Sequence, residues 1–308
     1  MQTEESREEY LAHFQKYNNC RLPFCIEVFS DKEGVHVVVV GATHGNEPAG
    51  VKAMVAFHQQ LQNGDLKLES GKVSLLLGNP QAFQEDQRYV DRDLNRDFSE
   101  LDGTTIEGRR AHDIIQYLEQ TSGIAALLDL HSVSIGDFKI CVYEKGDPYS
   151  LDLAHSISAI PLHFAFHPEH MPGSLVTAAG RMHICSLIVE CGNHQSRQGV
   201  NTALNHMHAL LAHYRILPDS AKVQKKAGAI IEQYESISAI KPGPNFKFLI
   251  PHVATGTKLS KGQVFAKDDN QEHIAPQECY IVVPSRVVKV TDVDAGFLGS
   301  LNMLKINN

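Results

Sequence analysis

The chain of 308 residues lacks the features that mark several large classes of protein. No run of Lys or Arg exceeds two residues, and 28 basic against 36 acidic residues give a net charge of −8, which argues against a nucleic-acid groove or an anionic membrane contact. No segment approaches the roughly 18 apolar residues of a membrane span. The opening "MQTEESREEYLAHF" is acidic where a secretory signal would be basic. We therefore expect a protein that binds neither nucleic acid nor membranes.

Cysteine is sparse and shows no pairing pattern. The six cysteines, at positions 20, 25, 141, 185, 191 and 279, are scattered and include no CxxC pair. In a chain of this length, that usage predicts reduced, mostly buried thiols in a cytoplasmic protein. Histidine is the one unusually frequent residue, with 17 copies, so the question is which few of them converge.

Up to about residue 217 the chain alternates between strand-like and helix-like segments. The apolar runs "GVHVVVVGA" (34–42) and "GKVSLLLGN" (71–79) open with glycine, which is typical of strands covered on both faces. Further strands are expected over 124–131, 138–145 and 183–192, and helices over 48–64, 104–123 and 201–217. At the start of the second helix, Thr104 and Glu107 have the spacing of a capping box. This order predicts a layered α/β domain with a largely parallel sheet.

From about residue 221 the pattern changes to short strand-like segments joined by Gly, Pro and Asn. These segments lie at 227–237, 246–253, 262–267 and 279–290, and none has a helical period. A chain of this length also suggests about two domains. We therefore predict an α/β domain over residues 1–217 and a small all-β domain over residues 218–308.

Polar residues of catalytic type follow four of the predicted strands. In chain order they are His44 and Glu47, the loop from Arg88 to Arg96, the pair Asp129 and His131, and finally Glu190. In an open α/β sheet, ligands bind beyond the carboxyl ends of the strands, so all four groups are expected at one edge. Two histidines and a carboxylate are a common catalytic zinc set, and a second carboxylate without a metal bond is what such a site needs as a general base.

Four motifs in this order carry a family resemblance: "HGNE" at 44–47, "RYVDRDLNR" at 88–96, "DLHS" at 129–132 and "IVECG" at 188–192. Together they resemble the succinylglutamate desuccinylase/aspartoacylase family, relatives of the zinc carboxypeptidases. The resemblance implies a zinc-carboxypeptidase-like α/β/α sandwich with a mixed, largely parallel sheet, and a small C-terminal all-β domain that caps the active site. It also implies one zinc ion per chain.

The resemblance also implies a role for each matching position. His44, Glu47 and His131 would bind zinc, and Glu190 would be the general base. Arg88 would polarise the scissile carbonyl. Asn95 and Arg96 would hold the free carboxylate of the substrate's amino-acid part, and Asp93 would orient His44.

Two residues keep alternative interpretations. Asp129 lies two residues before His131 on the same strand face, where it either orients that histidine or makes local hydrogen bonds. Arg181, nine residues before Glu190, is the nearest candidate for an additional arginine that would contact the side-chain carboxylate of an acidic substrate. Its surroundings, "AAGRMHICSLIVE", match the family pattern poorly, so the acyl group and the amino acid stay open.

The remaining histidines and one cysteine are expected to be structural. His163, His167 and His170 suggest a second metal site, but the first two are about 13 Å apart on a strand, so we interpret all three as polar loop residues. His206 and His213 are two helical turns apart and are expected on the surface. Cys191 is expected to be a small buried thiol.

The sequence thus predicts a zinc-dependent amidohydrolase that removes the acyl group from a small N-acyl amino acid. The alternative is a metallocarboxypeptidase that acts on short peptides. A binding protein without activity is disfavoured, because all three metal ligands and a base are present. The sequence leaves the oligomeric state and the metal bound in the cell open.

Overall fold

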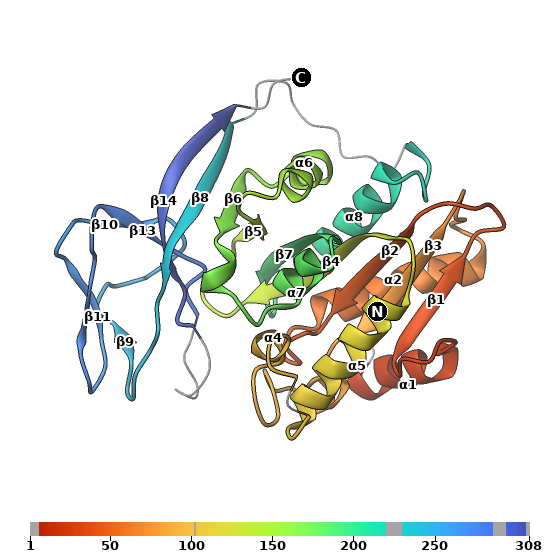
Figure 1. Ribbon diagram of the computed structural model, residues 1–308, viewed down its shortest axis with the longest axis horizontal. Helices are drawn as coiled ribbons and strands as arrows, with labels where there is room; N and C mark the ends of the chain where they lie inside the picture. The colour runs from red at the N-terminus through yellow and green to blue at the C-terminus, as the bar shows by residue number, and fades with distance from the viewer. Residues whose placement is uncertain (1–5, 102, 220–229, 286–293, 306–308) are drawn as a thin grey trace.

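The computed structural model describes residues 6–101, 103–219, 230–285 and 294–305, which form a mixed sheet covered by helices (Figure 1). Within the described residues the sheet has eleven strands in the order β1-β3-β2-β4-β7-β5-β6-β8-β14-β13-β10. Their bounds are β1 Cys25–Phe29, β2 His36–Gly41, β3 Lys72–Leu77, β4 Ile124–Val133, β5 Lys139–Glu144, β6 Leu162–Phe166, β7 Cys185–Asn193, β8 Ile230–Ala239, β10 Thr257–Leu259, β13 Cys279–Val282 and β14 Phe297–Lys305.

Strand directions divide this sheet into two regions. Strands β3, β2, β4 and β7 are parallel neighbours, and so are β5, β6 and β8, while β5 runs antiparallel to β7. Strands β8, β14, β13 and β10 pair antiparallel, and a separate antiparallel sheet holds β9 (Lys247–Phe248), β11 (Val264–Lys267) and β12 (Glu272–Ile274). The predicted fold class, a mixed and largely parallel sheet followed by a small antiparallel region, is confirmed.

Helices cover both faces because the central strands are apolar on both sides. Helices α1 (Arg7–Tyr17), α2 (Ala49–Asn63), α6 (Pro148–Ile157) and α8 (Arg197–His213) pack on one face, and α4 (Leu94–Asp97), α5 (Ile106–Gln120) and α7 (Leu175–Arg181) on the other (Figure 1). Successive side chains of a strand point to opposite faces. In β2, accordingly, Val37 and Val39 join the first core cluster and Val38 and Val40 the second.

The predicted helix over 48–64 is confirmed as α2, whereas the predicted cap of α5 is wrong by one residue. The cap of α5 is Thr105, whose Oγ1 accepts from the backbone N of Gly108 at 2.9 Å. Glu107 does not return to the helix start, because its buried carboxylate bonds to the preceding loop instead. The box predicted from Thr104 and Glu107 is therefore not formed.

Two of the structural histidines also differ from the sequence interpretation. His163 is fully buried in β6 rather than in a loop. His206 is buried as well, because α8 turns it inward to donate to the carbonyl O of Thr202 and to contact Ser158. His213 is exposed and Cys191 is buried, as expected. All six cysteines are free.

The C-terminal strands continue the sheet of the α/β region, since β8 pairs in parallel with β6 from Leu162↔Glu232 to Ala165↔Glu235. Parts of the predicted strands at 227–237 and 279–290 lie outside the described residues. The division into domains at residue 217 stays a prediction.

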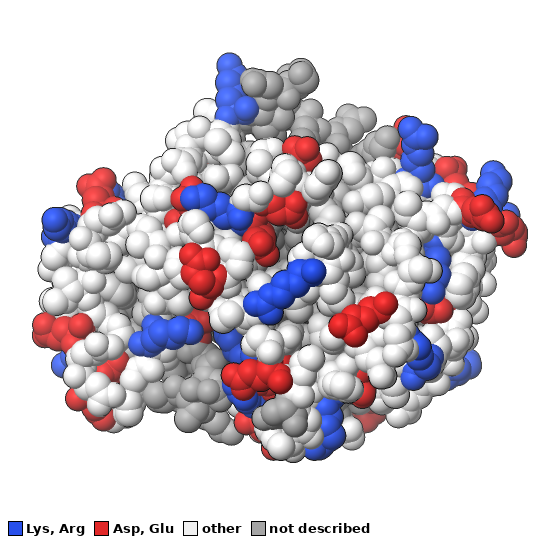
Figure 2. Space-filling view, in the orientation of Figure 1, with Lys and Arg blue, Asp and Glu red and all other residues white. Residues whose placement is uncertain are grey.

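Positive and negative side chains are interspersed over the face shown in Figure 2. No helix within the described parts of the chain is long and apolar enough to cross a membrane.

Candidate active site

Three buried side chains converge at the carboxyl ends of β2 and β4: His44, Glu47 and His131. His44 Nδ1 lies 2.9 Å from Glu47 Oε1, His131 Nδ1 lies 3.2 Å from Glu47 Oε2, and the two Nδ1 atoms are 3.2 Å apart. One potential ligand atom from each of the three lies within 4.8 Å of the others. In the described residues no other group of three such side chains meets this criterion.

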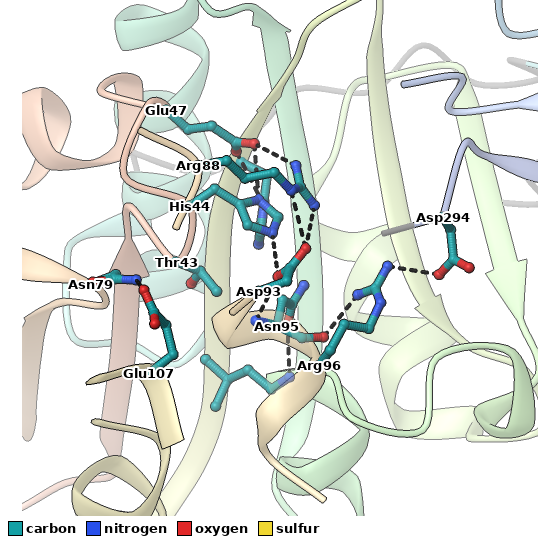
Figure 3. A network of polar contacts seen from close by, with 12 residues as sticks. Thr43, His44, Glu47, Asn79, Arg88, Asp93, Asn95, Arg96, Glu107 and Asp294 are labelled. Atoms are coloured by element: carbon teal, nitrogen blue, oxygen red, sulfur yellow. Dashed lines mark hydrogen bonds and ion pairs between the residues drawn. The ribbon is translucent and has the colours of Figure 1, made fainter. Parts of the chain in front are cut away.

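The opposite nitrogen of each imidazole is held by a carboxylate. His44 Nε2 lies 3.1 Å from Asp93 Oδ1, and His131 Nε2 lies 2.8 Å from Asp129 Oδ2 (Figure 3 shows the first pair). Because a carboxylate accepts, each Nε2 carries the proton and each Nδ1 offers its lone pair to the same point. The two Nδ1 atoms are 3.2 Å apart, and their lone pairs would repel each other unless a proton or a metal ion lies between them. The donor set therefore fits a zinc ion.

Burial and charge together set the protonation of this cluster. Burial lowers the pKa of His131, but the charges of Asp129 and Glu47 outweigh it and raise that pKa well above the ordinary value. Burial likewise opposes ionisation of Asp93, but the charges of Arg88 and His44 hold its pKa well below the usual range. Asp93 is thus ionised while it contacts the imidazole of His44.

The turn that carries His44 and Glu47 is packed tightly against its surroundings. Gly45 has no space for a side chain, since a Cβ there would lie 2.1 Å from the carbonyl carbon of Ala82. Arg7 of α1 donates from Nη1 to the carbonyl O of Gly45 at 2.7 Å and to that of Phe83 at 2.8 Å. Glu47 Oε2 also accepts from the backbone N of Ser132 at 2.7 Å, which joins this turn to the end of β4.

The loop after β3 places Arg88 beside the cluster. Arg88 donates from Nη2 and Nε to Asp93 Oδ2 at 2.9 and 3.1 Å, and its Nη1 lies 3.8 Å from Glu47 Oε1. Glu107 of α5 binds the backbone of this loop. The carboxylate of Glu107 accepts from Asn79 Nδ2 and from three backbone N–H groups, at positions 90, 91 and 92 (Figure 3 shows the contact with Asn79).

Asn95 and Arg96 follow in the short helix α4. Asn95 Oδ1 accepts from the backbone N of Leu175 at 2.9 Å. Arg96 donates from Nη1 to the carbonyl O of Asn95 and from Nη2 to Asp294 Oδ2, both at 2.8 Å (Figure 3). Its Nε is buried without an acceptor. A buried donor without a partner is costly in a folded protein, and such donors concentrate at functional sites.

Glu190 is a partly exposed residue between buried neighbours of β7, and it lies opposite His131 in the sheet register. Its Oε2 is buried and has no hydrogen-bond partner. Burial raises the pKa of Glu190 to about 8; the charge of His131 opposes this shift and that of Glu47 adds to it. An unpaired carboxyl group with a raised pKa beside a metal-type cluster is typical of a proton-transfer group.

These residues surround one cavity. Its lining includes His44, Glu47, Arg88, Asn95, Arg96, His131 and Glu190. Asp93 and Asp129 lie behind the two imidazoles, at the positions that orientation of His44 and His131 requires. Arg181 is not in this group, because it lies exposed at the end of α7, and the charge that it faces is Glu144.

Asp294, Arg7 and Glu107 are among the residues of the site that sequence reasoning missed. Asp294 lines the cavity beside Arg96, 198 positions along the chain, in the segment "DAGF", which has no recognisable motif. Arg7 and Glu107 act on the loops rather than on the cavity. The sequence shows Glu107 only as a carboxylate near a helix start. The capping-box interpretation already explained that position, so a contact with the loop was not predicted.

Comparison with known proteins gives concordant matches. Residues 33–217 match the family described as "Succinylglutamate desuccinylase/Aspartoacylase catalytic domain". An N-acyl-aromatic-L-amino acid amidohydrolase (carboxylate-forming) of Xenopus laevis is 35% identical over 159 residues, 49% of this chain and 51% of that protein. A probable aspartoacylase of Synechococcus sp. (strain CC9605) is 30% identical over 215 residues, 63% of this chain and 68% of that protein.

A solved structure extends the likeness over most of the chain. The succinylglutamate desuccinylase of Vibrio cholerae superimposes with a TM-score of 0.71 at 19% identity, covering 92% of this chain and 89% of the other. At this identity the likeness concerns the fold. The chain spans about half the length of the first curated relatives that it matches.

Proposed function

The chain belongs to the succinylglutamate desuccinylase/aspartoacylase family, and we propose that it is a zinc-dependent amidohydrolase that releases the acyl group from an N-acyl amino acid. One observation carries this proposal. Two imidazole Nδ1 atoms and the carboxylate of Glu47 converge while carboxylates contact both Nε2 atoms, and Glu190, whose buried Oε2 has no hydrogen-bond partner, lies beside them.

His44, Glu47 and His131 would hold one zinc ion per chain, which supplies a Lewis acid that acidifies water and polarises a carbonyl group. Glu190 Oε2 takes a proton from the attacking water as the new C–O bond forms. The same carboxyl group then gives this proton to the amide nitrogen as the C–N bond breaks, so a carboxylate and an amine leave. A carboxyl group without another partner is free for both transfers.

Arg88 and Arg96 would bind two different negative charges: the oxyanion that forms during the reaction and the α-carboxylate of the substrate. Two hydrogen bonds to Asp93, from Nε and Nη2, fix Arg88 at the cavity, and its remaining Nη1 would stabilise the oxyanion. Arg96 and Asn95 receive the α-carboxylate, a task for which the planar fork of arginine is suited. Asp93 and Asp129 keep the two imidazoles in the required tautomer.

A metallocarboxypeptidase acting on short peptides is the alternative with the same catalytic groups. The cavity is lined in part by residues of the C-terminal strands and their connections, among them Val283, Asp294 and Phe297. These residues narrow the space beside the catalytic groups, which favours a small substrate over a peptide chain.

A cytoplasmic location, expected from the free cysteines, remains part of the proposal.

The test uses protein loaded with one equivalent of zinc and a panel of N-acetyl amino acids, their methyl esters and a hexapeptide. We expect hydrolysis of the free acids, poor turnover of the esters and none of the hexapeptide. Comparable rates on hexapeptide and N-acetyl amino acids would favour the carboxypeptidase. No hydrolysis of any N-acyl amino acid by the zinc-loaded protein would reject the proposed function.

A further inference from the structure

Two cysteines meet in the turn that joins α1 to β1. Cys20 and Cys25 flank the segment "RLPF", and the thiol of Cys25 donates a hydrogen bond to the sulfur of Cys20. Cys20 Sγ also lies 3.5 Å from the carbonyl O of Leu22 and 3.8 Å from that of Cys25. Neither cysteine lines the cavity of the proposed active site. The pair is therefore a cluster of reactive groups that the proposed mechanism does not use.

Asn18 holds this turn closed. Its Nδ2 donates to the carbonyl O of Cys20 at 2.8 Å, and its Oδ1 accepts from the backbone N of Cys25 at 3.2 Å. At the Cys25 end, the carbonyl O of Phe24 accepts from the backbone N of Leu77 at 3.1 Å, which attaches the turn to β3. One amide side chain thus bonds the backbones of both cysteines, so the two sulfurs stay close together.

The two thiols differ in exposure and in pKa. Cys20 is partly exposed, whereas Cys25 is fully buried. The hydrogen bond from Cys25 lowers the pKa of Cys20, with help from the charge of Lys72, although burial and the charge of Glu27 oppose this shift. The same hydrogen bond and burial raise the pKa of Cys25 well above its ordinary value. Because the thiolate is the nucleophile, Cys20 is the thiol that attacks first and Cys25 is the one that follows.

We propose that Cys20 and Cys25 form a redox-active dithiol, which hydrogen peroxide oxidises to a disulfide. The thiolate of Cys20 attacks the peroxide: an S–O bond forms, the O–O bond breaks and the released hydroxide takes a proton to become water. Cys25 then attacks the sulfur of the resulting sulfenic acid, so that an S–S bond forms, the S–O bond breaks and a second water leaves with the thiol proton. Two thiols are oxidised and one peroxide is reduced to two waters. A small dithiol reverses the reaction by exchange.

Two variants separate the roles of the two thiols. Cys25→Ser keeps the attacking thiol and removes its partner, so peroxide should leave a sulfenic acid on Cys20 that dimedone traps. Cys20→Ser should leave Cys25 unoxidised, because a buried thiol with a raised pKa is inert. Cys185→Ser is the matched control and should form as much of the disulfide as the wild type. Oxidation of Cys25 in Cys20→Ser, or no dimedone adduct in Cys25→Ser, would refute the assigned roles.

The reactivity of Cys20 is measured against that of Cys185 in the native wild type. Cys185 is also partly exposed, but burial raises its pKa to about 11, whereas the pKa of Cys20 is lowered. At neutral pH Cys20 therefore carries about a hundredfold more thiolate, of which the weaker nucleophilicity of a less basic thiolate leaves about a tenfold advantage. Iodoacetamide should alkylate Cys20 at least about tenfold faster than Cys185. Equal rates would remove Cys20 as the attacking thiol.

The deciding experiment treats the zinc-loaded full chain with one equivalent of hydrogen peroxide, blocks the free thiols with iodoacetamide in urea and digests the protein without reductant. Trypsin cleaves after Arg21, so Cys20 and Cys25 fall in separate peptides, 17–21 and 22–32. We expect mass spectrometry to find these peptides joined after peroxide and separate after dithiothreitol, with the other four cysteines alkylated. The readout is the state of the thiols, so it is independent of the proposed function. Peptides 17–21 and 22–32 that stay separate after peroxide would overturn the inference.

Discussion

Replacing Glu190 by Gln separates a general base from a metal ligand and from a structural carboxylate. The amide keeps the shape of the side chain and cannot take the proton from water. A general base contributes about 10²–10⁴ in rate, so kcat should fall by that factor. The three proposed ligands are untouched, and the variant should still bind one zinc ion per chain.

The raised pKa of Glu190 gives a second, independent effect in the metal-free protein. Burial raises this pKa from 4.5 to about 8, so the folded state holds the proton more tightly than the unfolded state. The group therefore lowers the free energy of unfolding as pH rises from about 4.5 to 8, at up to about 1.4 kcal/mol per pH unit. Because Glu190 is partly exposed, we expect its ionisation to lower the free energy of unfolding by only about 1–3 kcal/mol at pH 8.5.

The assay is urea unfolding of the metal-free wild type and Glu190→Gln at pH 5 and pH 8.5. The variant should be more stable by about 1–3 kcal/mol at pH 8.5 and nearly equal at pH 5. Zinc should reduce the difference, because a cation favours the carboxylate. Loss of zinc together with activity would make Glu190 a ligand. Equal stabilities at both values of pH would show that the carboxylate is solvated and would refute the burial argument.

The remaining predictions concern the metal, the carboxylate and the turn that carries the ligands. His44→Ala and His131→Ala should each lose zinc by elemental analysis while circular dichroism shows a retained fold; full metal content in both would remove them from the site. Arg96→Lys should lower kcat/KM for an N-acetyl amino acid by about 1.5–3 kcal/mol and hardly affect its methyl ester, whereas equal losses would exclude contact with the carboxylate. Arg7→Ala loses the bond to Gly45 and should weaken zinc binding about tenfold in chelator competition, with part of the affinity restored in Arg7→Lys; an unchanged affinity would show that the contact is incidental.

The placement of the proposed catalytic groups was predictable because it follows from strand direction. The run of four valines in β2 is apolar on both sides, which predicts a strand with helices on each face, as the two core clusters confirm. Parallel strands bring their carboxyl ends to one edge, so residues at or just after the carboxyl ends of β2, β3, β4 and β7 come together although they are far apart in the chain. That rule placed His44, His131 and Glu190 in one cavity.

The missed features depend on tertiary contacts that leave no local pattern. Asp294 meets Arg96 only because the antiparallel C-terminal strands return to the edge of β6 through β8. His206 is buried because Thr202 and Ser158 satisfy its ring nitrogens, which periodicity cannot show. The cap of α5 was misplaced because Thr104 and Thr105 are adjacent, and a shift of one residue is within the usual uncertainty of a helix boundary.

Glu107 is a buried carboxylate that holds the loop between Arg88 and Asp93. Its side chain is fully buried, and its two oxygens accept four hydrogen bonds, from Asn79 and from the backbone at 90, 91 and 92. These contacts fix the chain between Arg88, which faces the cluster, and Asp93, which orients His44. This segment carries three charged groups of the proposed site, Arg88, Asp93 and Arg96. A displacement of the segment should therefore lower the rate of the proposed reaction.

Glu107→Gln should therefore reduce both stability and catalysis. In the wild type, the backbone N–H groups donate to the carboxylate of Glu107. In the variant, the NH2 group of the amide would face some of these N–H groups and could not accept from them. Each buried donor left without an acceptor costs about 1–3 kcal/mol. We expect a lower midpoint of urea unfolding, and a kcat/KM at least about tenfold lower under conditions where the variant is fully folded, with zinc retained. Glu27→Gln is the matched control, because Glu27 pairs with Lys72 and Tyr117 away from the cavity, and should lower stability alone. If Glu107→Gln is destabilised but keeps full kcat/KM, the loop is positioned by its other contacts and Glu107 only stabilises the fold.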